Sequence, residues 1–373
     1  MTITKTAVLF ALLIGICSSV ASFATPNTTR PSHKIGIVAP LTGPLAEYGV
    51  ATRNGIELAK SNMPEQFKDI EFIYEDSAYD PKTALAAFNK LHALDNVSLV
   101  LDWGAQTSQA IAPVAERAKF PFISMSIEPA VSAGRQYVVR FHSDANQYAR
   151  AIVDYLMAHK IQRVALIKAE IVYFNKILAG LRQQLPKSVT LDVIAELSPA
   201  QTDFKVEISK IRTQPYDMVG VFLVSGQISQ FYKQMHEQRV SLPTFGSDFF
   251  DSPPEIAAAN NLMDGAVFPE YGFTEPFRVE YEKRFKKASQ LPYAALAYDF
   301  AVHVATVFAK LDSDASGLVL VDAFTNLSKN RGVTGEYIFE NTSEGGKSFK
   351  FPFVLKQIRN GEVTVAGGGG GVG

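Results

Sequence analysis

The sequence predicts an α/β protein with two largely parallel β-sheets. Short apolar runs alternate with helical patterns along the whole chain, which indicates βαβ units with helices on both faces of a parallel sheet. The alternation restarts after about Arg140, where residues 162–167 have the pattern of a first strand in a second lobe. The length agrees with two lobes, because 373 residues exceed what one hydrophobic core usually supports.

The elements follow in a regular order. Predicted strands lie at residues 35–39, 70–75, 97–101, 120–124, 163–167, 189–194, 218–224 and 266–268. A helix is predicted over residues 80–94, where Asp80 can cap, Pro81 takes the first helical position, and Ala84, Phe88 and Leu91 share one face. A hairpin turn is predicted between residues 337–339 and 349–355.

The N-terminus has the pattern of a cleavable export signal. Lys5 supplies the positive charge, residues 7–16 the apolar run, and residues 22–24 an A-x-A-like site, so Thr25 should begin the mature chain. The apolar run is too short to span a bilayer, and no later segment approaches the roughly 20 apolar residues required. Cys17 follows Ile16, whereas lipid attachment favours a small residue before the cysteine. We therefore expect soluble export.

Composition excludes several classes of protein. The only cysteine is Cys17, inside the signal, so the mature chain can form neither disulfides nor cysteine metal sites. The 36 Lys and Arg balance the 37 Asp and Glu, which leaves no basic stripe for nucleic acid. The six histidines show no paired spacing, so no metal and no cofactor are predicted. The sequence also has no G-x-S-x-G elbow for a serine nucleophile.

Two glycine-rich segments imitate nucleotide-binding motifs. The tail holds a G-x-G-x-x-G at Gly368, Gly370 and Gly373, but no strand precedes it, so residues 366–373 are interpreted as a disordered end. Residues 345–348 (Gly-Gly-Lys-Ser) resemble the end of a P-loop, but Asn341 stands where the leading glycine is required. Both segments are therefore excluded as phosphate sites.

The first strand leads into a loop that carries a family resemblance. Gly36, Pro40, Thr42-Gly43, Ala46 and Gly49 match the spacing of "G-x-x-x-P-x-(S/T)-G-x-x-A-x-x-G". This segment resembles the opening of the leucine/isoleucine/valine-binding protein family, the type I periplasmic solute-binding proteins. Residues 75–81, 110–124 and 201–204 resemble further motifs of that family in the same order. The resemblance covers about residues 34–365.

The resemblance implies two doubly wound lobes joined by a three-segment hinge. By this resemblance the chain crosses between lobes near Arg140, Pro269 and Arg331. Residues 34–140 and 270–331 would then form lobe 1, and residues 141–269 and 332–365 would form lobe 2. Residues 1–24 would be the signal peptide. Ligands of such open α/β lobes bind at the carboxyl ends of the strands.

Candidate ligand contacts in lobe 1 come from three loops and one helix. The resemblance places an aromatic side chain on the ligand at Tyr48, with a surface cap as the alternative. After residues 97–101, a helix N-terminus could hold a carboxylate, with Gln106 and Thr107 as the candidates. Thr107 could equally cap that helix. Trp103 could stack on the ligand, but we expect it to pack under the loop. Tyr293 matches a tyrosine of the family ahead of a helix.

Ser126 and Glu128 lie where amino-acid binders offer a backbone carbonyl and a threonine. A carboxylate at Glu128 would repel the α-carboxylate of an ordinary amino acid, or it could point to solvent at the rim.

Lobe 2 contributes Tyr173 and Asp248 by the same resemblance. Tyr173 matches the tyrosine of an "x-Y-G" turn, although Phe174 replaces the glycine. Asp248 aligns with the acid that pairs with a ligand ammonium; the alternative is that it caps a helix over residues 253–259. Tyr271 is a weaker candidate near a crossing.

These features together imply a periplasmic substrate-binding protein rather than an enzyme. The expected ligand is an amino acid or a similar small polar molecule, captured by hinge closure and delivered to an ABC permease. The chain is expected to be a monomer. A ligand sensor on the same fold is the alternative, and a neighbouring permease gene would favour transport. A periplasmic hydrolase using Glu128 and Asp248 is a weaker alternative, which turnover of a bound ligand would reveal.

Overall fold

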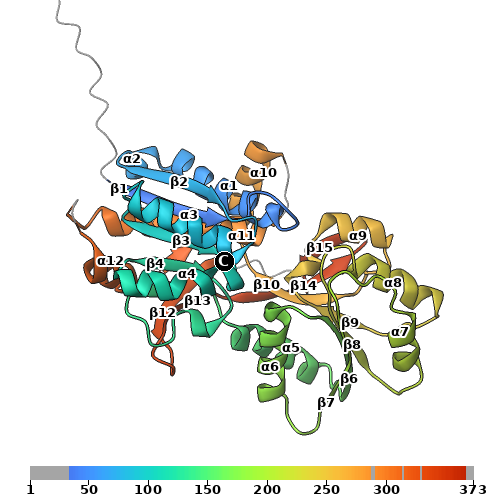
Figure 1. Ribbon diagram of the computed structural model, residues 1–373. Helices are drawn as coiled ribbons and strands as arrows, with labels where there is room; N and C mark the ends of the chain where they lie inside the picture. Colours follow the sequence, from blue (N-terminus) through green and yellow to red (C-terminus); the bar gives the residue numbers. More distant parts are fainter. Residues whose placement is uncertain (1–32, 287–289, 313–314, 328–329, 367–373) are drawn as a thin grey trace, which may run out of the picture. The chain divides into compact units, whose positions relative to one another are not determined.

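The computed structural model describes residues 33–286, 290–312, 315–327 and 330–366. The predicted signal peptide, Cys17 and the glycine-rich tail from Gly367 lie outside these ranges. Within them the strands form two sheets flanked by helices (Figure 1). This confirms the predicted α/β class with two lobes. Both sheets are mixed rather than purely parallel, because each ends in antiparallel strands.

The first sheet has eight strands in the order β11-β12-β13-β5-β4-β3-β1-β2. Its strands are β1 (His33–Ala39), β2 (Ile70–Asp76), β3 (Leu99–Trp103), β4 (Phe122–Met125), β5 (Val138–Arg140), β11 (Asn330–Gly332), β12 (Gly335–Asn341) and β13 (Lys347–Lys350). Strands β1 to β5 are parallel to their neighbours, and β12 and β13 form the predicted hairpin. The P-loop-like residues 345–348 therefore lie in that hairpin.

The second sheet has seven strands in the order β15-β14-β10-β9-β8-β6-β7. Its strands are β6 (Arg163–Ala169), β7 (Thr190–Leu197), β8 (Met218–Phe222), β9 (Thr244–Gly246), β10 (Val267–Tyr271), β14 (Phe353–Arg359) and β15 (Glu362–Val365). The order β7-β6-β8-β9 repeats the order β2-β1-β3-β4 of the first sheet. Each sheet is thus doubly wound, with its order reversing beside its first strand.

Helices cover both faces of each sheet. They are α1 (Ala46–Asn62), α2 (Pro64–Phe67), α3 (Pro81–Ala93), α4 (Ala105–Ala118), α5 (Ala145–Ala158), α6 (Val172–Gln184), α7 (Lys205–Arg212), α8 (Ile228–Glu237), α9 (Pro253–Ala259), α10 (Glu275–Phe285), α11 (Leu291–Phe308) and α12 (Gly317–Thr325), with short 3-10 turns η1 (Pro129–Val131) and η2 (Asp248–Phe250). The predicted cap of α3 is present, since Asp80 accepts a hydrogen bond of 2.8 Å from the backbone N–H of Thr83.

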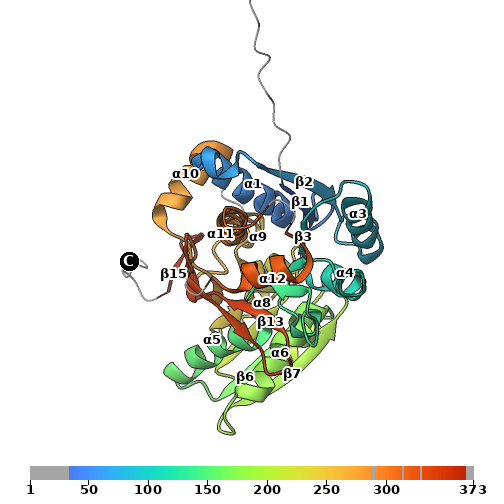
Figure 2. The same ribbon diagram turned by 90° about the vertical axis from the view of Figure 1, so that its left-hand side faces the viewer.

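Successive side chains of the first strand in each sheet point to opposite faces and pack in different hydrophobic cores. Ile35 and Ile37 pack with α1, α11 and α12, whereas Val38 packs with α3 and α4 on the opposite face. Figure 2 shows α1 and α11 on one side of the first sheet and α3 and α4 on the other. In the second sheet, Ile167 faces α7, α8 and α9, and Leu166 faces α5 and α6. The period of two in a strand places successive side chains in different cores.

The chain passes between the sheets at three places. Strand β5 ends at Arg140 and β10 ends at Tyr271, close to the predicted crossings near Arg140 and Pro269. The third crossing was predicted near Arg331 and is wrong, because β12 and β13 still belong to the first sheet. The chain leaves that sheet only between β13 and β14, so residues 332–350 belong to lobe 1. The prediction failed because a hairpin that pairs with its own sheet has the same local sequence pattern as two strands that enter a new lobe.

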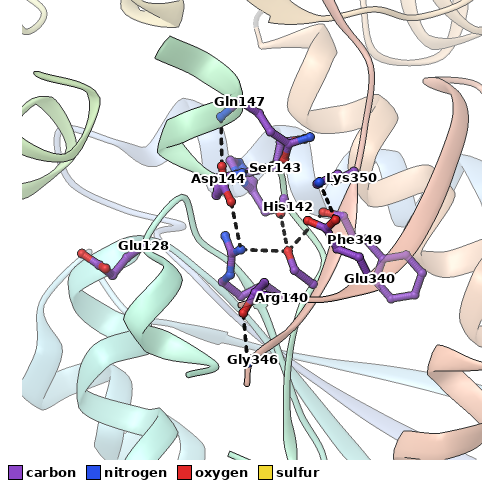
Figure 3. Close-up of polar contacts among 12 residues, drawn as sticks. Glu128, Arg140, His142, Ser143, Asp144, Gln147, Glu340, Gly346, Phe349 and Lys350 are labelled. Atoms are coloured by element: carbon purple, nitrogen blue, oxygen red, sulfur yellow. Dashed lines mark hydrogen bonds and ion pairs between the residues drawn. The ribbon is translucent and has the colours of Figure 1, made fainter. Parts of the chain in front are cut away.

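Hydrogen bonds tie the three crossing segments together. Ser143 donates its N–H to the Tyr271 hydroxyl at 3.1 Å, and its Oγ accepts from the backbone N–H of Phe351 at 2.9 Å. Arg140 is fully buried and donates from Nη2 to Ser348 Oγ at 2.8 Å. Its guanidinium also faces Asp144 at 3.8 Å, at the start of α5 (Figure 3). The three segments therefore form one hydrogen-bonded hinge.

One described helix, α11, is long and apolar enough to span a membrane, contrary to our expectation that no later segment would be. However, 83% of its apolar window is buried inside the structure. The helix packs closely on α1, where Gly55 approaches the backbone of Ala294. Its apolar composition is accounted for by this central position in the core.

Candidate ligand cavity between the two sheets

A cavity of about 510 Å³ lies where the strand order of each sheet reverses. In the first sheet this point is between β1 and β3, and in the second between β6 and β8. Loops that leave the carboxyl ends of adjacent strands in opposite directions open a crevice there. The volume falls in the range of small-molecule sites. The cavity is lined by Pro44, Leu45, Tyr48, Ala78, Tyr79, Trp103, Gly104, Gln106, Met125, Ile127, His142, Ile171, Val172, Tyr173, Pro199, Val224, Ser225, Asp248, Phe249 and Tyr293.

Aromatic rings form the first-lobe wall of this cavity. The ring of Tyr48 lies 5.0 Å from that of Trp103 and 5.1 Å from that of Tyr293, and Trp103 lies 5.6 Å from Tyr293. Tyr48 comes from the first turn of α1, and Tyr293 from the first turn of α11. Phe249 approaches Tyr48 from the second lobe at 6.0 Å. The wall is largely apolar and rich in π-electron faces.

Asp248 provides a carboxylate at the second-lobe wall. It follows β9, and its backbone N–H donates to the Tyr148 hydroxyl at 2.7 Å. Tyr173 donates to Asp248 Oδ1, and Tyr293 donates to Oδ2 at 2.7 Å. Burial raises the pKa of Asp248, against the lowering effect of the two tyrosine hydroxyls. Because Tyr173 belongs to lobe 2 and Tyr293 to lobe 1, the carboxylate links the two lobes.

Asp248 does not cap the following helix. Ser252 occupies the N-cap position of α9 instead, which removes the alternative explanation for an acid at this position. A second buried acid, Glu270, lies near Asp248, and its pKa is raised well above the ordinary value, first by burial. The charge of Asp248 also raises the pKa of Glu270, since two negative charges in a dry interior repel.

The helix after β3 differs from the expected carboxylate site. Gln106 lines the cavity and donates from Nε2 to the backbone oxygen of Tyr79 at 2.8 Å. Thr107 is buried away from the cavity, and its hydroxyl donates to Asp102 Oδ2 at 2.8 Å. Neither side chain caps the helix, since Gly104 holds the N-cap position with φ at +125°. The conformation and the closeness of Tyr79 both require glycine there.

Ser126 and Glu128 lie behind the cavity wall. The Ser126 hydroxyl accepts from the backbone N–H of Glu128 at 3.1 Å. The Glu128 carboxylate is 2% exposed, and it pairs with Lys176 of α6 at 2.8 Å and accepts from the N–H of Ala130 at 3.1 Å. It therefore neither lines the cavity nor points to solvent, contrary to both interpretations of the sequence. The pair joins the loop after β4 to a helix of the other lobe.

The structure brings together five of the eight predicted contact residues, namely Tyr48, Gln106, Tyr173, Asp248 and Tyr293. Their contact with a ligand stays a prediction. Tyr271, the weaker candidate, is buried in the hinge, where its hydroxyl lies 3.0 Å from His142 Nδ1. Sequence reasoning missed Tyr79, Phe249 and His142. Of these, Phe249 directly follows Asp248 and could have been found from that position.

The charge of the cavity wall is low. Among the described residues that line it, none is Lys or Arg, and Asp248 is the one acid. Burial lowers the pKa of His142 to about 4, so this imidazole is neutral near pH 7. No group of three or more His, Cys, Asp or Glu that could hold a metal occurs among the residues with described positions. The described wall thus offers one carboxylate and many aromatic faces.

A profile of the periplasmic binding protein family matches residues 32–360. The chain belongs to this family. Within it, the chain is 24% identical over 263 residues to the Leu/Ile/Val-binding protein BraC3 of Rhizobium johnstonii, covering 67% of this chain and 70% of the relative. It is also 24% identical over 327 residues to the leucine-specific-binding protein of Salmonella typhimurium, covering 80% and 85%. The predicted family is confirmed.

Solved structures of the family share the fold. The branched-chain amino acid transporter substrate binding protein LivJ from Streptococcus pneumoniae, in complex with isoleucine, has a TM-score of 0.77 at 20% identity, covering 89% of this chain and 97% of that one. A solute binding protein of an ABC transporter from Rhodopseudomonas palustris BisB5, in complex with 3,4-dihydroxy benzoic acid, has a TM-score of 0.76 at 21% identity, covering 89% and 94%. Members of this fold therefore hold chemically different ligands.

Proposed function

We propose that the protein is the substrate-binding component of an ABC transporter and that its cavity captures a small ligand carrying a cationic group. Family membership supports the transport role, and the cavity at the two strand-order reversals supports the ligand site. We further propose that the chain is exported to the periplasm as a monomer and delivers its ligand to a permease in the inner membrane. Binding without chemical turnover is proposed, in keeping with relatives that are named as binding proteins.

The observation that carries the proposal is the buried carboxylate of Asp248 beside an aromatic wall. An ammonium that enters a partly dry cavity must be paired, because an unpaired buried charge is strongly unfavourable. Asp248 can supply this pair, and the faces of Tyr48, Trp103 and Tyr293 attract a cation through their π-electrons. The proposed ligand is an amino acid or a related small molecule with an ammonium group.

Capture is coupled to the hinge by the partners of Asp248. In the described arrangement, Tyr173 of one lobe and Tyr293 of the other donate to the same carboxylate. An ammonium bound there would add a third partner that contacts groups from both lobes. Ligand binding would then favour the form in which the lobes are close, since a ligand stabilises the state that it contacts most. The permease would recognise that form.

A ligand screen followed by one substitution tests this proposal. Thermal-shift measurements over amino acids, amides, polyamines and aromatic acids should identify a ligand, because binding to the folded state adds about 2.7 kcal/mol at a concentration of 100 Kd. Calorimetry should then show that Asp248→Asn weakens binding about 30-fold to several-thousand-fold, as expected when one partner of a buried ion pair is lost. The circular dichroism spectrum should be unchanged.

Asp264→Asn is the matched control. Asp264 is an exposed acid of the same lobe that does not line the cavity, and it accepts from the N–H groups of Asn360 and Gly361. This substitution removes the same formal charge and should leave affinity unaltered. Equal affinity of the parent and Asp248→Asn, or a native ligand that is neutral or purely anionic, would contradict the cation proposal.

A further inference from the structure

We infer that the cavity selects amines that lack a carboxylate, and that Tyr79 together with Asp102 sets this selectivity. The inference rests on the proposed function, because Asp248 supplies the counter-charge for the amine. It narrows the substrate class from amino acids in general to apolar primary amines. The two residues act at the N-terminus of α4, which is the part of the cavity wall best suited to hold a carboxylate.

Tyr79 is held in place by a strained and well-bonded loop. Ala78 and Tyr79 both have positive φ values, of 46° and 58°, which non-glycine residues rarely adopt. Asp76 Oδ1 accepts from the N–H of Ala78 at 2.8 Å, and Ser77 Oγ accepts from the N–H of Tyr79 at 3.2 Å. Gln106 Nε2 donates to the Tyr79 carbonyl at 2.8 Å. Strain of this kind persists only where surrounding contacts fix it, and here it directs the Tyr79 side chain.

The Tyr79 ring covers the start of α4. A Cβ atom added at Gly104 would lie 2.5 Å from Tyr79 Cε2, so the ring lies directly against the N-cap residue. The ring centre is 5.7 Å from that of Trp103. Burial, followed by the charge of Asp102, raises the pKa of the Tyr79 phenol to about 12, against the lowering effect of the backbone N–H groups of Ala105 and Gln106. The Tyr79 ring thus occupies the space beside the first residue of this helix end.

Asp102 places a carboxylate beneath the same helix end. It is completely buried, and its Oδ2 accepts from Thr107 at 2.8 Å and from Ser108 at 2.6 Å. The positive end of a helix dipole favours one nearby anion. Here the protein provides that anion itself, so a ligand carboxylate would meet a like charge once Asp102 is ionised. Its pKa is raised to about 7 by burial, so the repulsion is present above neutral pH.

The rest of the wall offers a ligand carboxylate no cation. Its described residues include neither Lys nor Arg, and His142 is neutral near pH 7. An amine can pair with Asp248, whereas the carboxylate of the corresponding amino acid would stay unpaired in an apolar cavity. Burying an unpaired charge is far less favourable than leaving it in water. The described geometry therefore discriminates between two ligands that differ only in that group.

Matched ligand pairs test the inference directly. Calorimetry at pH 8 on the mature chain should compare phenethylamine with phenylalanine, tyramine with tyrosine, and 3-methylbutylamine with leucine. In the parent protein, we expect each amine to bind at least about tenfold more tightly than its amino acid. A tenfold difference in Kd corresponds to about 1.4 kcal/mol of binding free energy. Tyr79→Gly suits the positive φ, removes the ring and exposes the N–H groups of α4. It should reduce the amine preference at least about tenfold.

Lys160→Gly is the matched control for the backbone change. Lys160 also has a positive φ, of 55°, but lies after α5 and outside the cavity lining. The Lys160→Gly variant should keep the parent's preference for amines over amino acids. The circular dichroism spectra of both glycine variants should match that of the parent. Tyr79→Phe, which keeps the ring and removes only the hydroxyl, should retain most of the preference if the ring excludes the carboxylate.

The outcomes separate this inference from the proposed function. If each amino acid binds as tightly as its amine and Asp248→Asn abolishes both, the proposed function stands and the inference is overturned. An unchanged preference in a folded Tyr79→Gly variant also overturns it. If none of the six compounds binds to the parent, the inference is overturned, whereas the cation site is decided by the wider ligand screen and by Asp248→Asn.

Discussion

Replacing Asp102 by Asn should stabilise the protein more at high pH than at low pH. The Asp102 carboxylate is completely buried beneath α4 and receives hydrogen bonds on Oδ2 alone, while Oδ1 has no partner within hydrogen-bonding distance. Burial raises its pKa from 3.8 to about 7. An Asn side chain keeps an oxygen that can accept from Thr107 and Ser108, but it never ionises. The substitution therefore isolates the free energy of the buried charge.

The sign and size follow from proton linkage. Because the folded state holds the Asp102 proton more tightly than the unfolded state, parental stability falls as pH rises from about 4 to about 7 and is constant above that. Each pH unit within this window corresponds to roughly 1.4 kcal/mol. Between pH 5 and pH 8 the stability of Asp102→Asn relative to the parent should thus rise by about 3 kcal/mol. The unpaired Nδ2 of Asn adds a constant penalty of about 1–3 kcal/mol, which does not change the slope.

Urea unfolding followed by circular dichroism at several pH values measures this difference. Asp154→Asn, at an exposed position on α5, is the control for loss of a carboxylate and should show no such rise. A difference between Asp102→Asn and the parent that stays constant from pH 5 to pH 8 would refute the reasoning. Thr107→Val adds a second check, because losing one donor should raise the pKa of Asp102 further and shift the transition to higher pH.

Two further predictions concern packing and export. Gly55→Ala should lower the free energy of unfolding by at least about 1–3 kcal/mol, because the new Cβ would lie 2.0 Å from the Ala294 backbone oxygen and force α1 away from α11. Ser61→Ala, on the exposed side of α1, is the control and should have little effect. Urea unfolding measures both variants, and equal stability of the two would contradict the packing argument. The intact mass of the exported protein should equal that of a chain that begins at Thr25 and carries no lipid. A mass that corresponds to an acylated N-terminus at Cys17 would show instead that the chain is anchored to a membrane.

Much of the cavity wall could be predicted from the sequence because it follows strand ends. Tyr48, Tyr173 and Asp248 each lie shortly after a strand, and parallel strands bring their carboxyl ends to one edge of a sheet. Buried strands and capped helices are local patterns, which explains why Asp80 and the start of α3 were predicted correctly. Whether each side chain faces the cavity is a separate matter.

Contacts between distant parts of the chain determine whether the side chains of Glu128 and Tyr79 face the cavity. Glu128 lies in a loop of lobe 1, but its partner Lys176 is on α6 of lobe 2, and no local pattern connects them. Tyr79 is part of a helix-capping motif in the sequence, yet its ring lies against Gly104, which follows a different strand. The position of the third crossing was predicted wrongly for the same reason, since only the pairing of β13 with β5 shows that β13 belongs to the first sheet.

The sequence by itself determined the alternation of most strands and helices, the two α/β lobes, the family and the candidate acid Asp248, but not the short strands β5, β9, β11 and β15. These depend on side-chain periodicity and on motifs a few residues long, which are written in neighbouring positions. The tertiary structure alone decided the place of the last crossing, the pairing of Glu128, and the covering of α4 by Tyr79 and Asp102. These depend on contacts between residues far apart in the chain, where burial and charge are set by whichever side chains the fold brings together.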